Sequence, residues 1–153
     1  MTLDEFRDAL ATAVADELAA AHPRLADEEM RGFDLGCMPW HGYLELSFLT
    51  ADEDPIVDED PTSEIAAWRL YNFAKGDTGQ WPRGAELEQW LLEADRKIAK
   101  EQIFAACAEA LRSPEVIAAL EAYRRRPGFI CTVMDPDAPD LGDYVGGGQP
   151  EWP

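Results

Sequence analysis

The sequence predicts an α+β fold in which a small, mainly antiparallel sheet packs with about four to five helices. Residues 32–50 alternate apolar and polar side chains in two runs, as expected for a β-hairpin. Most other segments repeat apolar residues at helical spacing and need a sheet to cover. With 153 residues and 46% hydrophobic content, we expect one domain over 1–134 and an acidic, glycine-rich tail over 135–153.

The first element is expected to be a helix that begins after Thr2. Thr2 and Glu5 have the spacing of a capping box, in which each side chain binds a backbone N–H at the helix start. Apolar residues then recur at three- and four-residue steps as far as Ala21. We expect the helix to end near His22–Pro23, since proline restricts the residue before it, and residues 23–31 to form a connector.

The predicted hairpin joins two strands through the turn Pro39–Gly42. In each strand, alternate residues are apolar and form one face suited to a core. The apolar positions are Phe33, Leu35 and Cys37 in the first strand and Leu44, Leu46 and Phe48 in the second.

An acidic loop is expected after the hairpin, because Asp52–Pro55 is repeated as Asp58–Pro61. The carboxylates repel one another and the prolines donate no backbone hydrogen bond. Asp60 followed by Pro61 also suits a helix entrance. We therefore expect a helix over 62–74, although residues 68–73 also alternate as a strand would.

Two further helical patterns cover 85–98 and 104–111, with a turn-rich stretch over 75–84 before them. Their apolar stripes point in different directions if each residue advances the helix by ~100°. A break near Lys100 is therefore expected.

Ser113 and Pro114 are suited to begin another helix, as N-cap and first helical residue. The cationic run 124–126 is suited to end that helix. Residues 129–134 are rich in β-forming side chains and are expected to form a strand that pairs with the hairpin. For the tail, disorder is the default expectation; the alternative is docking through Tyr144, Val145 and Trp152.

The charge and cysteine content narrow the class of partner and the compartment. A formal net charge of -18 argues against nucleic acid or an anionic membrane and favours a cationic partner. Cys37, Cys107 and Cys131 lie in apolar patterns, which indicates reduced thiols and a cytoplasmic location. The N-terminal segment has no basic region typical of a signal peptide, and no apolar run approaches the ~20 residues of a membrane span.

Candidate catalytic and metal-binding patterns are weak. Cys37 and His41 flank the hairpin turn, but the chain has one other histidine, His22, so a zinc site lacks ligands. The acidic repeats lack the ligand spacing of a calcium loop, and no nucleophile motif is present. We therefore expect no cofactor and name no catalytic residue.

Three tryptophans, Trp40, Trp81 and Trp152, occur in turn contexts, where they either cap the core or anchor a partner. If the segment 69–126, which carries most of the cations, forms a layer on one side of the sheet, the hairpin end, the acidic repeats and the tail are expected to share one negative rim. The expected interface residues are Trp40, His41, Asp52, Glu53, Asp54, Asp58, Glu59, Asp60 and Trp81.

The order of elements resembles that of a bacterial family of unknown function found among polymorphic-toxin immunity proteins. The resemblance depends on Gly32–Leu35, Trp68–Phe73 and Phe129–Asp135. It implies a binding role and supplies no catalytic residue.

The leading hypothesis is an acidic, cytoplasmic interaction module, such as an immunity protein that neutralises a basic toxin or nuclease. One alternative is a small enzyme or ligand-binding protein with a pocket between sheet and helices, which a deep cleft holding His41 or a buried carboxylate with a perturbed pKa would favour. A second alternative is a structural or oligomerising domain, for which a large exposed apolar patch would be the sign. The oligomeric state stays open.

Overall fold

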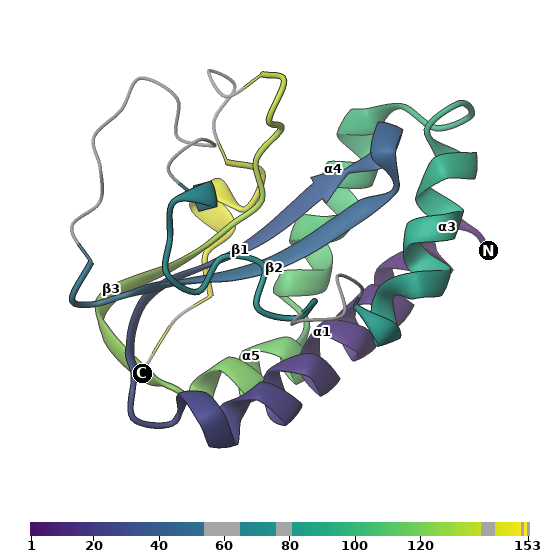
Figure 1. The fold of residues 1–153 in the computed structure, drawn as a ribbon. Helices are drawn as coiled ribbons and strands as arrows, with labels where there is room; N and C mark the ends of the chain where they lie inside the picture. The colour runs from purple at the N-terminus through teal and green to yellow at the C-terminus, as the bar shows by residue number, and fades with distance from the viewer. Residues whose placement is uncertain (54–64, 76–80, 139–142, 151, 153) are drawn as a thin grey trace.

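The computed structural model describes residues 1–53, 65–75, 81–138, 143–150 and 152, and it confirms the α+β class. Four α-helices and three strands lie within these residues (Figure 1). In chain order they are α1 (Leu3–Leu25), β1 (Glu29–Met38), β2 (Tyr43–Thr50), α3 (Ala85–Ala94), α4 (Lys100–Leu111), α5 (Pro114–Glu121) and β3 (Arg124–Thr132).

The sheet has the strand order β2-β1-β3. The predicted hairpin is present: β1 and β2 pair antiparallel, with Phe33 opposite Phe48 and Leu35 opposite Leu46. The third strand pairs with the hairpin as expected, and it runs parallel to β1, so the sheet is mixed. The parallel direction follows from the long connection through α3, α4 and α5, which returns the chain to the end of the sheet where β1 begins.

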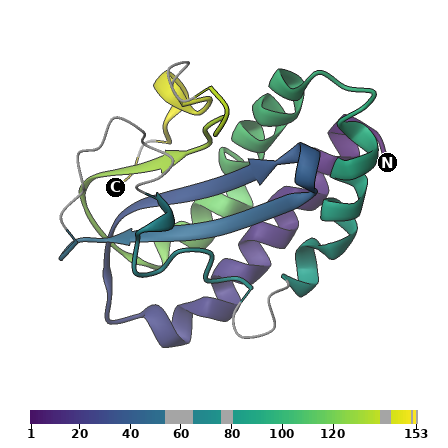
Figure 2. The same cartoon turned by 45° about the horizontal axis from the view of Figure 1, so that its top comes forward.

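The core lies between the helices and one face of the sheet, as Figures 1 and 2 show. The alternating apolar positions predicted for the hairpin all have exposed fractions of 0% or 1%. Phe6 and Leu10 of α1 and Phe104 of α4 are also fully buried. Each side chain of this size contributes roughly 1.5–3 kcal/mol when buried, so this layer holds the helices on the sheet.

Helix α1 begins as predicted and ends later than predicted. The backbone N–H of Thr2 donates to Glu5 Oε2 over 2.7 Å, and the N–H of Glu5 donates to Thr2 Oγ1 over 3.2 Å. The helix continues through Pro23 to Leu25. Pro23 has no N–H to donate to the carbonyl four residues earlier, which is unfavourable inside a helix, but the extension buries Leu25 in the core.

The predicted break near Lys100 is confirmed, since α3 ends at Ala94 and α4 begins at Lys100. Lys100 Nζ lies 2.7 Å from the buried carboxylate of Asp135, which anchors the start of α4. Ser113 caps α5 as predicted, with its hydroxyl accepting from the N–H of Val116.

The helix expected over 62–74 is wrong for the described residues, which are helical at Ile65 and Ala66 and then form turns. The backbone of this segment bonds to β2 instead. Phe48 N donates to Leu70 O over 3.2 Å, and Phe73 N donates to Leu46 O over 2.9 Å. These bonds use backbone groups that a helix needs internally, and they cover the outer edge of β2.

The cationic run 124–126 belongs to β3 and not to the end of α5, which is a correction to the predicted boundary. Between the pairs Met30↔Arg125 and Gly32↔Ile130, β3 uses several more residues than β1. This irregularity contains Pro127, which has no N–H to donate, and Gly128, at φ +83°.

The described part of the tail docks on the body, as the alternative prediction had it. Val145 is buried, and the Tyr144 ring lies 5.1 Å from that of Phe104. The Asp143 carboxylate accepts from the N–H groups of Val133 and Val145, both over 2.9 Å. The tail therefore adds to the same core.

Candidate functional site

The second face of the sheet carries two adjoining cavities, of about 150 Å³ and about 340 Å³. Both are lined by Ile65 and Met134, so they form one continuous depression, called here the sheet groove. It lies between the strands, the segment that follows Ile65 and the chain after β3. The smaller cavity contains carboxylates, and the larger cavity is mainly apolar.

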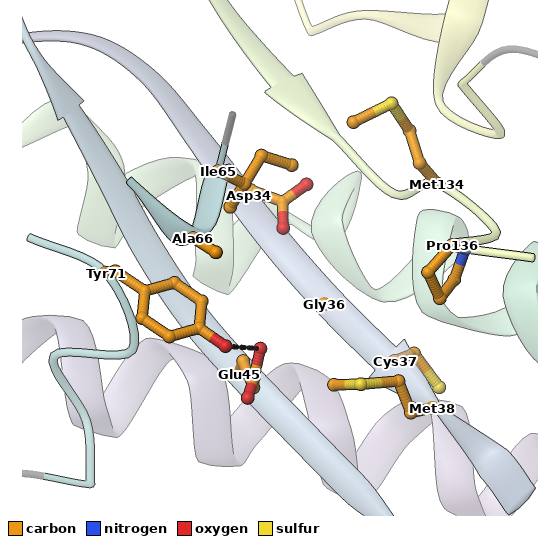
Figure 3. A pocket seen from close by; sticks show the side chains of 10 residues that line it. All are labelled: Asp34, Gly36, Cys37, Met38, Glu45, Ile65, Ala66, Tyr71, Met134 and Pro136. Atoms are coloured by element: carbon orange, nitrogen blue, oxygen red, sulfur yellow. Dashed lines mark hydrogen bonds between the residues drawn. The ribbon is translucent and has the colours of Figure 1, made fainter. Parts of the chain in front are cut away.

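Asp34 lies on β1 at the polar end of the groove (Figure 3). Its neighbours Phe33 and Leu35 face the core, so strand alternation turns Asp34 to the opposite face. The residue is 4% exposed, and its Oδ1 accepts a hydrogen bond of 2.6 Å from the Thr132 hydroxyl on β3.

Glu45 approaches from β2, opposite Gly36. The Tyr71 hydroxyl donates to Glu45 Oε2 over 2.7 Å, as Figure 3 shows. Burial and the Glu45 carboxylate raise the pKa of Tyr71, which keeps the phenol protonated as a donor. Tyr71 thus holds the Glu45 carboxylate against the groove.

Gly36 leaves room between the two carboxylates. A Cβ placed on Gly36 would lie 3.5 Å from Glu45 Oε2 and 3.7 Å from Asp34 Oδ2. Both acids therefore border the same small space. Within the described residues, neither carboxylate has an ion pair with a lysine or arginine.

Burial raises the pKa of Asp34 to about 7, opposed by the Thr132 hydrogen bond and reinforced by the charges of Asp143 and Glu45. Asp34 therefore exchanges its proton near neutral pH. This is a buried carboxylate with a perturbed pKa, the feature that favours the ligand-binding class over a purely structural domain.

Nucleophilic chemistry is not supported at the groove. Cys37 lines the smaller cavity but is 1% exposed. A hydrogen bond to Cys107 and burial raise the pKa of Cys37 well above its usual range. A protonated, inaccessible thiol is a poor nucleophile.

The larger cavity is lined by apolar side chains from three strands and from residues 65–75, called here the crossing segment because they run across the edge of β2. Leu49 lies on β2, Trp68 on the crossing segment and Ile130 on β3. Ile130 is 49% exposed, so it presents apolar surface to this cavity. This end of the groove offers apolar area to a ligand.

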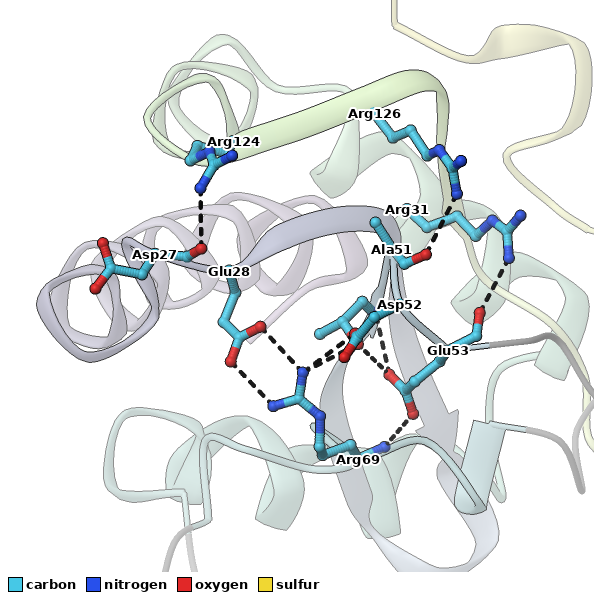
Figure 4. A network of polar contacts seen from close by, with 10 residues as sticks. Asp27, Glu28, Arg31, Ala51, Asp52, Glu53, Arg69, Arg124 and Arg126 are labelled. Atoms are coloured by element: carbon cyan, nitrogen blue, oxygen red, sulfur yellow. Dashed lines mark hydrogen bonds and ion pairs between the residues drawn. The ribbon is translucent and has the colours of Figure 1, made fainter.

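The acids predicted at the end of β2 are partly used inside the molecule (Figure 4). The Glu53 carboxylate accepts from the N–H and hydroxyl of Thr50, over 3.0 and 2.6 Å, and from the N–H of Arg69 over 2.7 Å. Asp52 lies 3.3 Å from the Arg69 guanidinium, which also pairs with Glu28. Glu53 is therefore a structural residue that joins the crossing segment to β2.

Among the described residues, the hairpin turn and the first acids after β2 do not share one rim. Trp40 and His41 lie at the hairpin turn, whereas Asp52 and Glu53 follow the other end of β2. The eight residues of β2 separate the two groups by roughly 25 Å at ~3.3 Å per residue. Asp54, Asp58, Glu59 and Asp60 lie outside the described residues.

Trp81 belongs to the core and is removed from the expected interface. Its ring is 0% exposed, and its indole N–H donates to Glu17 over 3.2 Å. Arg83 pairs with the same carboxylate over 2.7 Å. The core-capping alternative for the turn tryptophans therefore holds at this position.

Sequence reasoning missed Asp34, Glu45 and Tyr71. The available signal was an acid between two glycines in Gly32–Gly36, on a strand with apolar neighbours. Tyr71 had no signal, because its position follows from how the crossing segment bonds to β2.

The fold and the groove define a small α+β protein with a ligand-sized depression that is acidic at one end and apolar at the other. Comparisons with protein-family models, with curated proteins and with solved structures found no match to this chain. Over the described residues, no helix is long and apolar enough to cross a membrane. Nor do three or more His, Cys, Asp or Glu residues in that part of the chain form a group able to hold a metal ion.

Proposed function

We propose that the protein binds a small amphipathic amine in the sheet groove. The ammonium group lies between Asp34 and Glu45, and the apolar part lies along Leu49, Trp68 and Ile130. The observation that carries the proposal is a pair of carboxylates that border one small space and have no ion pair with a cationic side chain among the described residues.

The energetics favour a cation at this position. A buried carboxylate without a cationic partner is unfavourable, and Asp34 partly avoids the cost by keeping its proton. A cation ~4 Å away gains roughly 4 kcal/mol from each ionised carboxylate at an effective dielectric constant of about 20. An ammonium ligand would therefore drive the ionisation of Asp34.

Binding of the amine is expected to depend on pH with a definite sign. Asp34 must lose its proton to pair with an ammonium group, and its pKa in the free protein is about 7. A simple alkylamine stays protonated to about pH 10. Affinity should therefore be about tenfold higher at about pH 8 than at about pH 6, with a proton released on binding.

The test is calorimetric titration with n-alkylamines of increasing length at both pH values. Asp34→Asn is expected to lose the pH dependence and to weaken binding at about pH 8 by about tenfold or more. Ile130→Ser is expected to reduce the gain in affinity for each methylene added to the amine. This gain is about fourfold when the methylene is fully buried. Asp16→Asn, an exposed substitution on α1, is the matched control.

Two outcomes would contradict the proposal. One is equal affinity of the wild-type protein and Asp34→Asn for every amine. The other is tighter binding at the lower pH, which would indicate that protonated Asp34 donates to a neutral ligand.

A basic protein partner remains a second candidate function, favoured by the net charge of -18 and by the exposed Asp52, whose side chain is 73% exposed. Its test is capture of products of neighbouring genes at low and high salt. Charge reversal belongs at Asp58, Glu59 and Asp60, because reversal at Glu53 would also break its contacts with Thr50 and Arg69. If capture changed neither with salt nor with these charge reversals, electrostatic attraction would not be the basis of binding.

A further inference from the structure

Three consecutive arginines begin β3, and none of them has an ion pair with a described acidic residue. This is unexpected in a chain with 31 acidic and 13 basic residues. Arg124 donates to the carbonyl oxygen of Asp27 over 3.0 Å, and Arg126 donates to that of Ala51 over 3.3 Å (Figure 4). Both are therefore held by neutral acceptors.

Arg125 differs from its neighbours because its Nε and Nη1 are buried without a hydrogen-bond acceptor. Its guanidinium lies over the Trp152 ring, 4.9 Å from the centroid. The indole nitrogen of Trp152 is also buried without an acceptor. The Trp152 ring is fixed from another side by Phe129, at 5.2 Å between centroids.

Arg125 and Trp152, the residues that carry these buried donors, line a cavity of about 350 Å³, called here the Arg125 cavity. Its lining residues are Arg125, Arg126, Pro127, Gly128, Phe129 and Trp152. Among the described residues, none of these side chains is a carboxylate or an amide, so this part of the lining supplies donors and apolar surface. Gly128 adds room, since a Cβ built on it meets no atom within 4 Å.

The chemistry of this lining is suited to an oxyanion. A buried guanidinium without an acceptor is strongly unfavourable, and charge-assisted bonds to carboxylate or phosphate oxygens are those that arginine makes best. An indole N–H beside it supplies a further donor in a fixed direction.

We propose that the Arg125 cavity binds the oxyanion group, carboxylate or phosphate, of a small molecule. The guanidinium of Arg125 and the indole N–H of Trp152 are the donors, and a turn of the Arg125 side chain brings Nε and Nη1 to the anion. Gly128 lines both this cavity and the sheet groove. The donors lie on the side of Phe129, which packs in the core, whereas Ile130, the next residue, faces the sheet groove.

The experiment is an NMR titration of the whole chain with inorganic phosphate and, in a second arm, with acetate, at constant ionic strength. The readouts are the indole N–H of Trp152, assigned with Trp152→Phe, and the backbone amide of Phe129. We expect saturable shifts that require about tenfold more anion in Arg125→Gln and are unchanged in Arg96→Gln, which removes an exposed arginine. The arm with the higher affinity identifies the anion class.

Linear shifts without saturation, or equal weakening in Arg125→Gln and Arg96→Gln, would overturn the proposal. If Arg125→Gln does not fold, Trp152→Phe decides the matter, since it keeps a ring over the guanidinium and removes the donor. Calorimetry should then show binding weakened severalfold; unchanged affinity in Trp152→Phe would reject the site.

Discussion

Asp34 is the residue whose ionised form folding disfavours most directly. Strand alternation places its carboxyl in a buried space, because β1 is the central strand. Folding therefore favours the protonated form, while Thr132 stabilises the ionised form through a hydrogen bond of 2.6 Å. Together, burial and this hydrogen bond leave a carboxyl group inside the groove that titrates near neutral pH.

The raised pKa predicts how stability changes with pH. The folded-state pKa of Asp34 is about 7, above the unfolded value of about 4, so the folded protein holds the extra proton between these values. The contribution of Asp34 is fully present below about pH 4 and is lost as pH rises through about 7, by up to about 4 kcal/mol.

Asp34→Asn should remove this loss, because the amide keeps an oxygen for Thr132 and carries no charge. Compared with wild type, its free energy of unfolding in urea should be about 2–4 kcal/mol higher at about pH 8 and similar at about pH 4. Asp16→Asn should not change the difference between the two pH values. Parallel pH profiles for the wild-type protein and Asp34→Asn would show that Asp34 ionises normally.

At the scale of elements, the hairpin turn is fixed by its contact with α3. Gly42 has φ +63°, and a Cβ there would lie 2.5 Å from Leu92 Cγ and 2.8 Å from the carbonyl oxygen of Glu88. The turn therefore needs glycine for its backbone and for its packing.

Gly42→Ala and Gly128→Ala separate these two requirements. Gly128 also has positive φ, at +83°, but a Cβ there meets no atom within 4 Å. Gly128→Ala should cost about 1–2 kcal/mol from strain alone, and Gly42→Ala should cost about 3 kcal/mol or more because overpacking is added. Urea unfolding of both variants provides the comparison.

A second change tests the contact directly. Leu92→Ala in the Gly42→Ala background should recover part of the loss, since Leu92 is itself 43% exposed and its own truncation costs little. Equal losses for Gly42→Ala and Gly128→Ala would indicate that α3 moves aside without cost.

Elements were predicted well where the local signal and the packing agreed, as at the capping box of α1 and the break before α4. They were predicted poorly where backbone groups distant in the chain competed with local hydrogen bonds. Residues 67–74 have helical composition, yet their N–H and C=O groups pair with Phe48 and Leu46 of β2. Arg124–Arg126 suit a helix end, yet they belong to β3, where Arg124 pairs with Glu29 and Arg125 with Met30 of β1.

The whole molecule carries a net charge of -18, and its described ion pairs neutralise few of the acids. Repulsion among exposed carboxylates opposes compaction and is screened by salt over a Debye length of ~10 Å at 0.1 M. Added salt should therefore stabilise the fold, even though it also weakens the exposed pairs of Arg69 with Glu28 and Asp52.

We expect the thermal midpoint to rise by about 2–4 °C between low salt and about 0.3 M NaCl, equivalent to about 1 kcal/mol. Scanning calorimetry measures the change. A double variant, Asp16→Lys with Glu93→Lys, raises the net charge by four at exposed positions and should respond less. A midpoint that falls with salt would mean that attractive pairs outweigh the repulsion.

The sequence alone determined the fold class, the hairpin with its core-facing residues, the capped helix starts and the acidic balance. These features depend on local periodicity, capping chemistry and composition, which a single chain displays directly. The tertiary structure alone decided the parallel placement of β3, the burial of Trp81, the role of Glu53 and the meeting of Asp34 with Glu45. Each of these depends on contacts between residues distant in the chain, whose free energies no local pattern records.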